Sequence, residues 1–241
     1  MRFIDYLEYA LNIIYTPICI MCKANCYISN ILCKECWGEI SFITRPCCKK
    51  CATSLNFSKN IMLCTDESCI NEKHDCKYSI SIIEYNDFAK QIIKKFKFQS
   101  IFKLRKLFKN WLTYLLNTVY CDDIDYIFPI PLYKSKLKIR GYNQSAIIAK
   151  MVLEITKIKY DSKILIKIKN TANQSGLTKS LRGKNLKNSF HISTHNKKLI
   201  KGKKILLVDD IITTVSTINE CSKTLIRNGV SEVIVISIAR R

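Results

Sequence analysis

The segment from residue 205 to residue 217, ILLVDDIITTVST, constrains the fold of this 241-residue chain more than any other. Its apolar run ends in two adjacent carboxylates, Asp209 and Asp210, which hydroxyl residues follow where a helix begins. In open α/β sheets ligands bind beyond the carboxyl ends of the strands, and the free N–H groups of a helix N-terminus suit a phosphate. Acidic residues also end strands, and Ser or Thr cap helices, for purely structural reasons. The hydroxyl residues are Thr213, Thr214, Ser216 and Thr217, and residues 213–217 are called the hydroxyl loop below.

Strands and helices alternate around this segment from about residue 124 onward. Apolar runs predict strands at 125–132 (stopped by Pro129 and Pro131), 163–168, 203–210 and 231–239, and helical patterns cover 143–156 and 213–229. Asn143 is the expected cap of the first helix, and Gly229 closes the second. The order predicts an α/β fold with a mainly parallel sheet flanked by helices. A polar segment from Asn170 to Asn188 is long enough to be a functional loop.

A smaller N-terminal module precedes this part of the chain. We expect residues 1–77 to form a cysteine-rich zinc-binding module and residues 78–241 to form the α/β domain. Within the second, residues 78–118 bridge the two with a strand, at 78–85, and two amphipathic helices. The first 14 residues carry apolar side chains at helical spacing and predict a short amphipathic helix.

The cysteines are concentrated in the N-terminal module, where 11 of the 13 lie between Cys19 and Cys76. A CxxC turn brings two thiolates to one ion, and two such turns supply the four soft ligands of a closed structural zinc site. Cys26, Cys47, His74 and Cys76 are alternative ligands for the second, looser set, and some of these cysteines are equally well explained as buried free thiols. The first expected set is Cys19, Cys22, Cys33 and Cys36, and the second is Cys48, Cys51, Cys64 and Cys69.

Charge and cysteine usage bear on compartment and partners. The N-terminus lacks the uninterrupted apolar core of a signal peptide, so reduced, metal-binding thiols and a cytoplasmic location are expected. Lys and Arg number 40 against 19 acidic residues, a formal charge of +21 that favours polyanions such as nucleic acid. The lysines are spread along the chain and, like Ile and Asn, have AT-rich codons, so genome composition is the competing explanation.

Several ordered motifs resemble the ComF family, whose members are phosphoribosyltransferase-like proteins linked to competence and DNA uptake. The Asp-Asp-x-x-Thr-Thr-x-x-Thr pattern resembles the motif with which type I phosphoribosyltransferases bind 5-phosphoribosyl-1-pyrophosphate (PRPP). The resemblance spans residues 19–240. Besides the cysteine pairs it rests on Tyr85, residues 95–97 (KFK), 129–132 (PIPL) and 140–144 (RGYNQ), and on Thr171, Gln174, Arg182, Asn185, Phe190 and residues 239–240 (AR).

This resemblance implies a type I phosphoribosyltransferase-like fold and specific roles for its residues. Asp209 and Asp210 would bind the ribose hydroxyls, and the hydroxyl loop would hold the 5′-phosphate. Lys134 and Arg140 would face the Mg²⁺-bound pyrophosphate, and a loop with Lys179, Arg182 and Lys184 would close to exclude water. Implied cofactors are Mg²⁺ and structural Zn²⁺. Implied partners are PRPP or a related phosphorylated ribose, single-stranded DNA and DNA-uptake proteins.

Two departures from the family pattern affect these expectations. Val215 stands where the family has glycine, and a β-branched residue resists both unusual dihedrals and close approach of a phosphate. Cys64 and Cys69 are separated by four residues where a CxxC pair is usual, which weakens the second metal site. The main hypothesis is therefore a PRPP- and Mg²⁺-binding protein of DNA uptake. The alternatives are a catalytically weak scaffold that binds single-stranded DNA and a working phosphoribosyltransferase of nucleotide salvage; a zinc-ribbon transcription factor would not need the Asp pair.

Overall fold

The computed structural model describes eight stretches of the chain. They are residues 17–26, 31–58, 61–71, 74–98, 101–118, 123–171, 186–213 and 215–241. The helix expected within the first 14 residues lies outside them, as do Thr214 and residues 172–185 with Gln174, Lys179, Arg182, Lys184 and Asn185.

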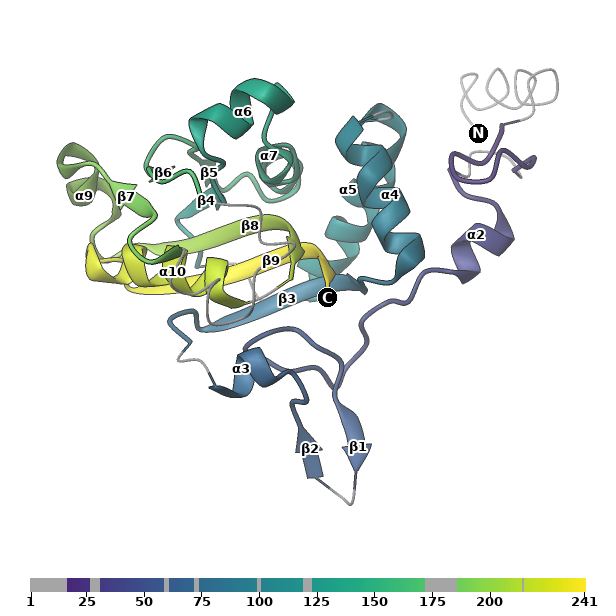
Figure 1. Cartoon of the computed structure of the whole chain (residues 1–241), viewed down its shortest axis with the longest axis horizontal. Helices are drawn as coiled ribbons and strands as arrows, with labels where there is room; N and C mark the ends of the chain where they lie inside the picture. The colour runs from purple at the N-terminus through teal and green to yellow at the C-terminus, as the bar shows by residue number, and fades with distance from the viewer. Residues whose placement is uncertain are drawn as a thin grey trace.

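A five-stranded sheet forms the centre of the molecule (Figure 1). Its order is β3 (Tyr78–Glu84), β9 (Glu232–Arg240), β8 (Lys204–Ile212), β4 (Tyr126–Pro129) and β5 (Lys159–Tyr160). Every neighbouring pair is parallel, which confirms the predicted α/β class. Because β9 separates β3 from β8, the sheet joins segments from both ends of the chain.

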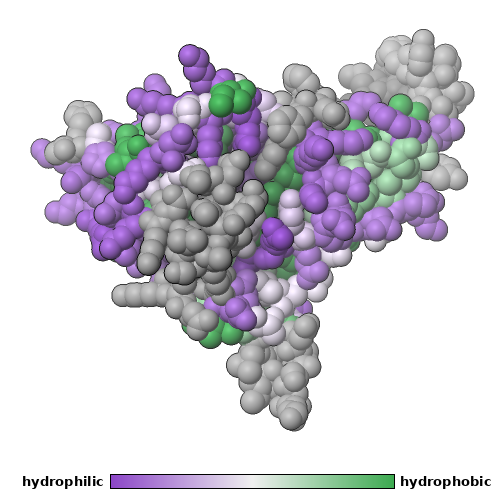
Figure 2. All heavy atoms as spheres, viewed as in Figure 1, coloured by the Kyte–Doolittle hydropathy of each residue, from purple (hydrophilic) through white to green (hydrophobic). Residues whose placement is uncertain are grey.

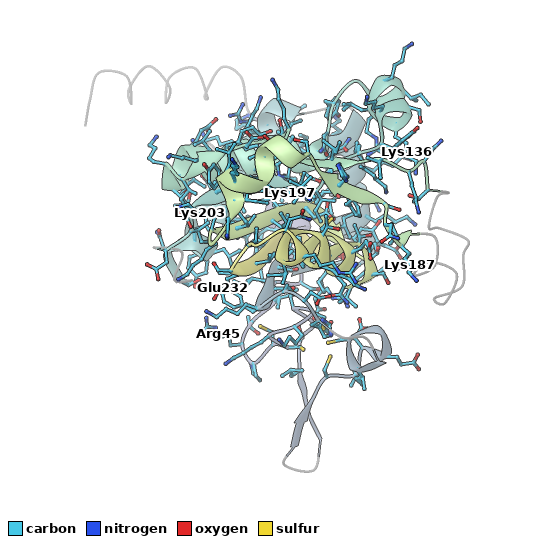
Figure 3. All side chains as sticks on the ribbon, turned by 90° about the vertical axis from the view of Figure 1, so that its left-hand side faces the viewer. Arg45, Lys136, Lys187, Lys197, Lys203 and Glu232 are labelled. Carbon is cyan, nitrogen blue, oxygen red and sulfur yellow. The ribbon has the colours of Figure 1, made fainter. Side chains whose placement is uncertain are left out.

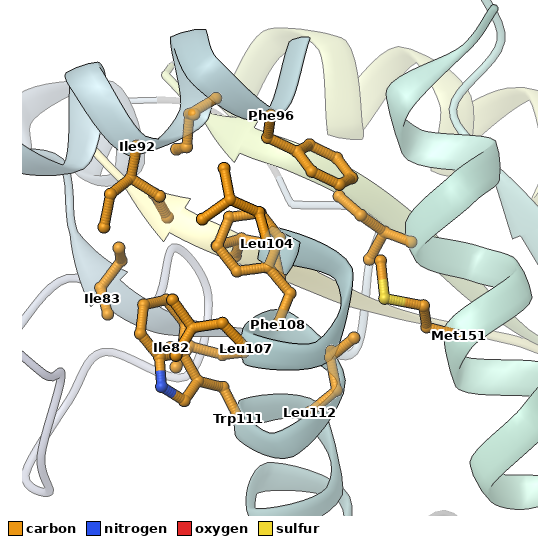
Figure 4. Close-up of a cluster of buried hydrophobic side chains, with 14 of the residues drawn as sticks. Ile82, Ile83, Ile92, Phe96, Leu104, Leu107, Phe108, Trp111, Leu112 and Met151 are labelled. Carbon is orange, nitrogen blue, oxygen red and sulfur yellow. The ribbon is translucent and has the colours of Figure 1, made fainter. Parts of the chain in front are cut away.

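One face of the sheet packs against α4 (Asp87–Phe98), α5 (Ile101–Thr118) and α7 (Gln144–Thr156). Leu206 and Val208 of β8 point into this face, as expected when alternate side chains of a strand lie on opposite sides. Figure 4 shows the core that they help to form, where the Phe96 and Phe108 rings pack in a tilted arrangement with centroids 4.9 Å apart. The two amphipathic helices predicted in the bridge therefore provide core packing.

The other face carries Ile205 and Leu207 and packs against α10 (Val215–Arg227). An antiparallel hairpin of β6 (Leu165–Lys167) and β7 (Phe190–Ile192) lies over α10 and is followed by α9 (Thr194–Ile200). The strand predicted at 163–168 exists, but it is shorter and belongs to this hairpin, apart from the parallel sheet. A short helix that the sequence did not predict, α6 (Lys134–Arg140), links β4 to α7.

The cysteine-rich segment passes from one face of the sheet to the other. It contains α2 (Lys34–Gly38), β1 (Asn56–Ser58), β2 (Ile61–Leu63) and α3 (Glu67–Asn71). Between α2 and β1 the chain runs along the outer edge of β3, where the Ile43 amide donates to the Ile82 carbonyl at 2.9 Å. Residues before this crossing join the α4–α5 core, whereas Lys49 accepts a backbone hydrogen bond from Ser79 after it. The domain boundary at residues 77 and 78 stays a prediction.

Candidate functional site

Asp209 and Asp210 lie on a part of β8 that extends beyond its neighbour β4. Pairing with β4 ends where Pro129 faces Val208, whereas pairing with β9 continues until Ile212 faces Arg240. The sequence predicted that the strand ends at the two acids. It instead continues for two more residues, because β9 pairs with it there. Both aspartates are half-buried. The site thus stands at the carboxyl edge of a parallel sheet, where α/β proteins bind ligands.

The start of α7 holds Asp209 in place. The Ser145 hydroxyl donates to Asp209 Oδ1 at 2.8 Å, and the Asp210 amide donates to the same oxygen at 2.9 Å. Asn143 is the predicted cap: its side-chain oxygen accepts from the Ser145 amide at 3.2 Å, and its Nδ2 donates to the Ile130 carbonyl at 2.9 Å. The RGYNQ motif therefore orients the first acid through the helix that it begins.

Arg140 belongs to the same arrangement, and Lys134 lies at the other end of α6 from it. An Arg140 guanidinium nitrogen donates to Gln144 Oε1 at 2.8 Å, and Gln144 is only 2% exposed. Gln144 thus fixes the guanidinium next to the residue that contacts Asp209. Lys134 is the exposed first residue of α6.

Lys167 on the hairpin is a residue of the site that sequence reasoning missed. Its Nζ lies 5.4 Å from the centroid of the Phe190 ring. Burial and the nearby Lys136 charge lower the pKa of Lys167, and the Asp209 carboxylate opposes this effect. Lys136, labelled in Figure 3, donates from Nζ to the Thr171 carbonyl at 2.9 Å. Lys167 therefore brings a positive charge into the electrostatic neighbourhood of Asp209.

The hydroxyl loop differs from expectation at Val215. Thr213 is exposed, Ser216 is buried and Thr217 is half-buried. Val215 is the first residue of α10, an α-helical position that valine can occupy. Its side chain is 1% exposed and packs against cysteines of the second set.

The described cysteines form the two expected groups. In each group the four Sγ atoms lie within 4.8 Å of one another, and no disulfide joins them. Tetrahedral Zn²⁺ with Zn–S bonds of about 2.3 Å requires S–S separations of about 3.8 Å, so both groups fit this ion. Separations of 3.5 Å between the Cys22 and Cys33 sulfurs and 3.7 Å between those of Cys48 and Cys69 agree. The groups are called tetrad 1 (Cys19, Cys22, Cys33 and Cys36) and tetrad 2 (Cys48, Cys51, Cys64 and Cys69).

Local hydrogen bonds shape both tetrads. Burial raises the pKa of Cys19, but hydrogen bonds from the backbone of Cys22, Cys33 and Met21 outweigh this and lower it to about 6, whereas burial raises the pKa of Cys36 and of Cys69. In tetrad 2, the Cys69 amide donates to Asp66 Oδ1 at 3.1 Å at the start of α3. This turn accommodates the longer Cys64–Cys69 spacing. The alternative ligands Cys26, Cys47, His74 and Cys76 belong to neither tetrad.

Comparisons with known proteins agree with this two-part structure. A double zinc ribbon domain matches residues 10–70, and a phosphoribosyl transferase domain matches residues 146–241. Together with the parallel sheet, these matches define a type I phosphoribosyltransferase fold with an N-terminal double zinc ribbon. The ribbon match and the two tetrads support structural zinc.

The relatives identify the family. The chain is 31% identical over 228 residues to Competence protein F of Haemophilus influenzae, covering 92% of this chain and 96% of that protein. It is 26% identical to Competence protein ComFC of Bacillus subtilis over 82% of this chain and 79% of that protein. The DNA utilization protein YhgH of Escherichia coli is 33% identical over 48% of this chain and 49% of its own length. The chain belongs to the ComF family of competence proteins. Among the described residues, no helix is long and apolar enough to span a bilayer.

Proposed function

We propose that this protein binds PRPP with Mg²⁺ at the carboxyl edge of the sheet and acts with DNA-uptake proteins during natural competence. The observation that carries the proposal is the Asp209–Asp210 pair, which extends beyond β4 and is held by Ser145 from the RGYNQ helix. The names of the competence and DNA utilization relatives support the biological role. A cytoplasmic location agrees with the reduced thiols.

Each part of the site has a role in this proposal. The carboxylates of Asp209 and Asp210 accept hydrogen bonds from the ribose hydroxyls, and Ser145 keeps Asp209 oriented toward them. The hydroxyl loop and the start of α10 bind the 5′-phosphate. Bound Mg²⁺ would supply positive charge to the pyrophosphate, and carboxylate oxygens suit this hard cation.

Positive side chains on the β6–β7 hairpin and on α6 face the pyrophosphate in the same proposal. Lys167 lies close enough to Asp209 for their charges to interact, and Lys136 lies close to Lys167. When pyrophosphate leaves, cations held in advance stabilise the charge that develops on it. Arg140, fixed by Gln144, contributes in the same way, as do Lys134 and Arg182, the latter outside the described residues.

Calorimetric titration with PRPP and Mg²⁺ tests the proposal. We expect wild-type protein to bind and the Asp209→Ala/Asp210→Ala double variant to lose at least roughly tenfold in affinity, because a charged hydrogen bond contributes about 1.5–3 kcal/mol. Asp123→Ala is the matched control: its carboxylate pairs with Lys204 at 3.1 Å, at the opposite end of β8. The proposal is wrong if wild type does not bind PRPP, or if the double variant and Asp123→Ala bind alike.

Release of pyrophosphate separates the catalytic alternatives. A working transferase, including one of nucleotide salvage, releases pyrophosphate from PRPP when the correct acceptor base is present. A protein that binds PRPP without releasing pyrophosphate across a panel of purine and pyrimidine acceptors is a sensor or scaffold.

Single-stranded DNA binding is a second candidate function, favoured by an exposed aromatic cluster on the zinc ribbon. Trp37 and Phe42 are 47% and 38% exposed, and their ring centroids lie 5.7 Å apart. Exposed rings stack with bases, while lysines neutralise the phosphate backbone. The described surface seen in Figure 2 is largely hydrophilic. Lys187 and Lys197, labelled in Figure 3 in a view turned by 90°, are exposed.

Fluorescence anisotropy with a labelled oligothymidylate tests this function. Affinity is expected to fall steeply with added salt, and Trp37→Ala should weaken it several-fold, since stacking contributes about 1–3 kcal/mol per base. Tyr114→Ala removes an aromatic side chain that is 76% exposed on α5 and serves as the control. Binding that is absent, insensitive to salt, or equally affected by both substitutions would exclude this candidate.

A further inference from the structure

Arg240 is a buried guanidinium that joins two parts of the molecule. It is the last residue of β9 and is only 3% exposed. One of its terminal nitrogens donates to the carbonyl oxygens of Ile212, at 2.9 Å, and Thr213, at 3.2 Å. These carbonyls belong to the end of β8 and the first residue of the hydroxyl loop, so Arg240 holds the entry to the proposed phosphate site.

The opposite side of the same guanidinium contacts tetrad 2. Its other terminal nitrogen pairs with Asp66, whose second carboxylate oxygen accepts from the amide of the ligand Cys69. Its Nε donates to Thr53 Oγ1 at 3.2 Å, and that hydroxyl lies 3.2 Å from the Cys51 sulfur. A tetrathiolate zinc centre has a net negative charge, which this buried cation compensates.

A hydrophobic contact also joins tetrad 2 to the hydroxyl loop. Val215, the first residue of α10, packs with Cys51 and Cys69 in one buried cluster. The backbone on both sides of residue 214 is therefore fixed by tetrad 2: Thr213 by a hydrogen bond through Arg240, and Val215 by direct contact.

We propose that tetrad 2, acting through Arg240 and Val215, positions the hydroxyl loop, so that metal in tetrad 2 is required for tight binding of the ribose 5′-phosphate. Arg240 is then a positioning residue that does not itself touch the ligand. The proposal rests on the proposed PRPP site and adds a regulator to it: loss of zinc by chelation or thiol oxidation would release the loop.

Tetrad 1 provides an internal control. Cys19, Cys33 and Cys36 share the core cluster of α4 and α5, on the face of the sheet away from α10, and neither Arg240 nor Val215 is in contact with tetrad 1. The same chemical change in the two tetrads should therefore have different effects on the loop.

The experiment compares Cys48→Ser in tetrad 2 with Cys22→Ser in tetrad 1. Each full-length protein is measured for zinc content by mass spectrometry and for PRPP·Mg²⁺ affinity by calorimetry. Both variants should lose one zinc ion. Coupling between linked sites is typically about 5–150-fold, so Cys48→Ser should weaken PRPP binding by at least roughly fivefold, while Cys22→Ser changes it less than about twofold. The proposal is overturned if both variants lose PRPP affinity equally, or if neither loses PRPP affinity.

A second variant keeps the metal and removes the connection. Arg240→Lys retains the positive charge but not the planar fork that reaches Asp66, Thr53 and the loop carbonyls together. It should keep both zinc ions and still bind PRPP at least roughly fivefold more weakly than wild type. If the Arg240→Lys protein holds both zinc ions and binds PRPP as tightly as wild type, the proposed role of Arg240 is contradicted.

Hydrogen–deuterium exchange separates this proposal from the PRPP proposal, because it requires no ligand. Amides of residues 212–219 should exchange faster in Cys48→Ser and in Arg240→Lys than in wild type, and at the wild-type rate in Cys22→Ser. If wild type fails to bind PRPP but the exchange differs in this way, only the PRPP proposal fails. Unchanged exchange in this segment would refute the coupling itself.

Discussion

Side chains at the site are held by partners that are distant in sequence. Asp209 receives its hydrogen bond from Ser145, 64 residues earlier, and Arg240 pairs with Asp66, 174 residues earlier. The sequence predicted Asp209, Asp210 and the cap Asn143, because strand ends and caps are local patterns. It did not predict Lys167, since one lysine among the 40 basic residues of the chain has no local signal. Lys167 could be recognised only once the hairpin placed it near Asp209.

Val215 gives a prediction at this scale. Val215→Gly removes a side chain that is 1% exposed and places glycine in the first turn of α10. The free energy of unfolding should fall by about 2–3 kcal/mol, from lost burial and lower helix propensity. Urea denaturation of the zinc-loaded protein measures it, with Val215→Ala as the intermediate control. A glycine variant as stable as wild type would mean that the contact with tetrad 2 contributes nothing.

Among the elements, those with strong periodicity were predicted well. Helices α4, α5, α7 and α10 and strands β3, β8 and β9 match the expected segments to within a few residues. The weak elements were not predicted. Strand β5 has only two residues, and α6, with the sequence KSKLKIR, has Ile139 88% exposed and so lacks a buried apolar stripe. Such elements depend on tertiary neighbours, which periodicity does not contain.

The hairpin provides the prediction at the element scale. Lys167→Ala should weaken PRPP binding roughly tenfold, because a hydrogen bond to a charged group contributes about 1.5 kcal/mol or more. Stability should not fall, because Lys167 is partly buried beside the Lys136 charge. Lys169→Ala is the control on the same hairpin, since Lys169 is exposed and donates to the Lys187 carbonyl at 2.8 Å. Calorimetry measures both affinities. If the two substitutions weaken PRPP binding equally, Lys167 contributes no more to binding than Lys169 does.

At the scale of the whole molecule, the zinc ribbon and the sheet share one core. Three tetrad 1 cysteines belong to the same buried cluster as Phe108 and Trp111 of α5, and the Trp37 and Trp111 ring centroids lie 6.3 Å apart across the junction. The CxxC spacing predicted the metal ligands, but nothing in it predicted that the ribbon passes around β3 to contact both faces. Contacts of this kind depend on shape, and a linear pattern does not contain them.

Zinc removal should therefore disturb the entire junction. The chain has two tryptophans, Trp37 and Trp111, so fluorescence excited selectively at tryptophan reports on this contact. Chelation of both ions should shift the emission to longer wavelength, because Trp111 is 6% exposed and would gain water. The Trp37→Phe variant isolates the signal of Trp111. Mass spectrometry first confirms that the protein is free of metal. An unchanged emission spectrum would then show that the ribbon is independent of the core.

The position of β9 between β3 and β8 has a consequence for how the chain folds. Ser81 and Ser237 share a hydrogen bond across 156 residues, and among the described strands of the sheet β3 pairs with β9 alone. During synthesis the zinc ribbon and β3 emerge long before the strand that connects them to β8. Pairings this distant along the chain form slowly, since the ends of a long loop must meet first. Until then the apolar face of β3 is exposed, and early metal loading of the ribbon, whose crossing segment covers the outer edge of β3, would limit aggregation of the nascent chain.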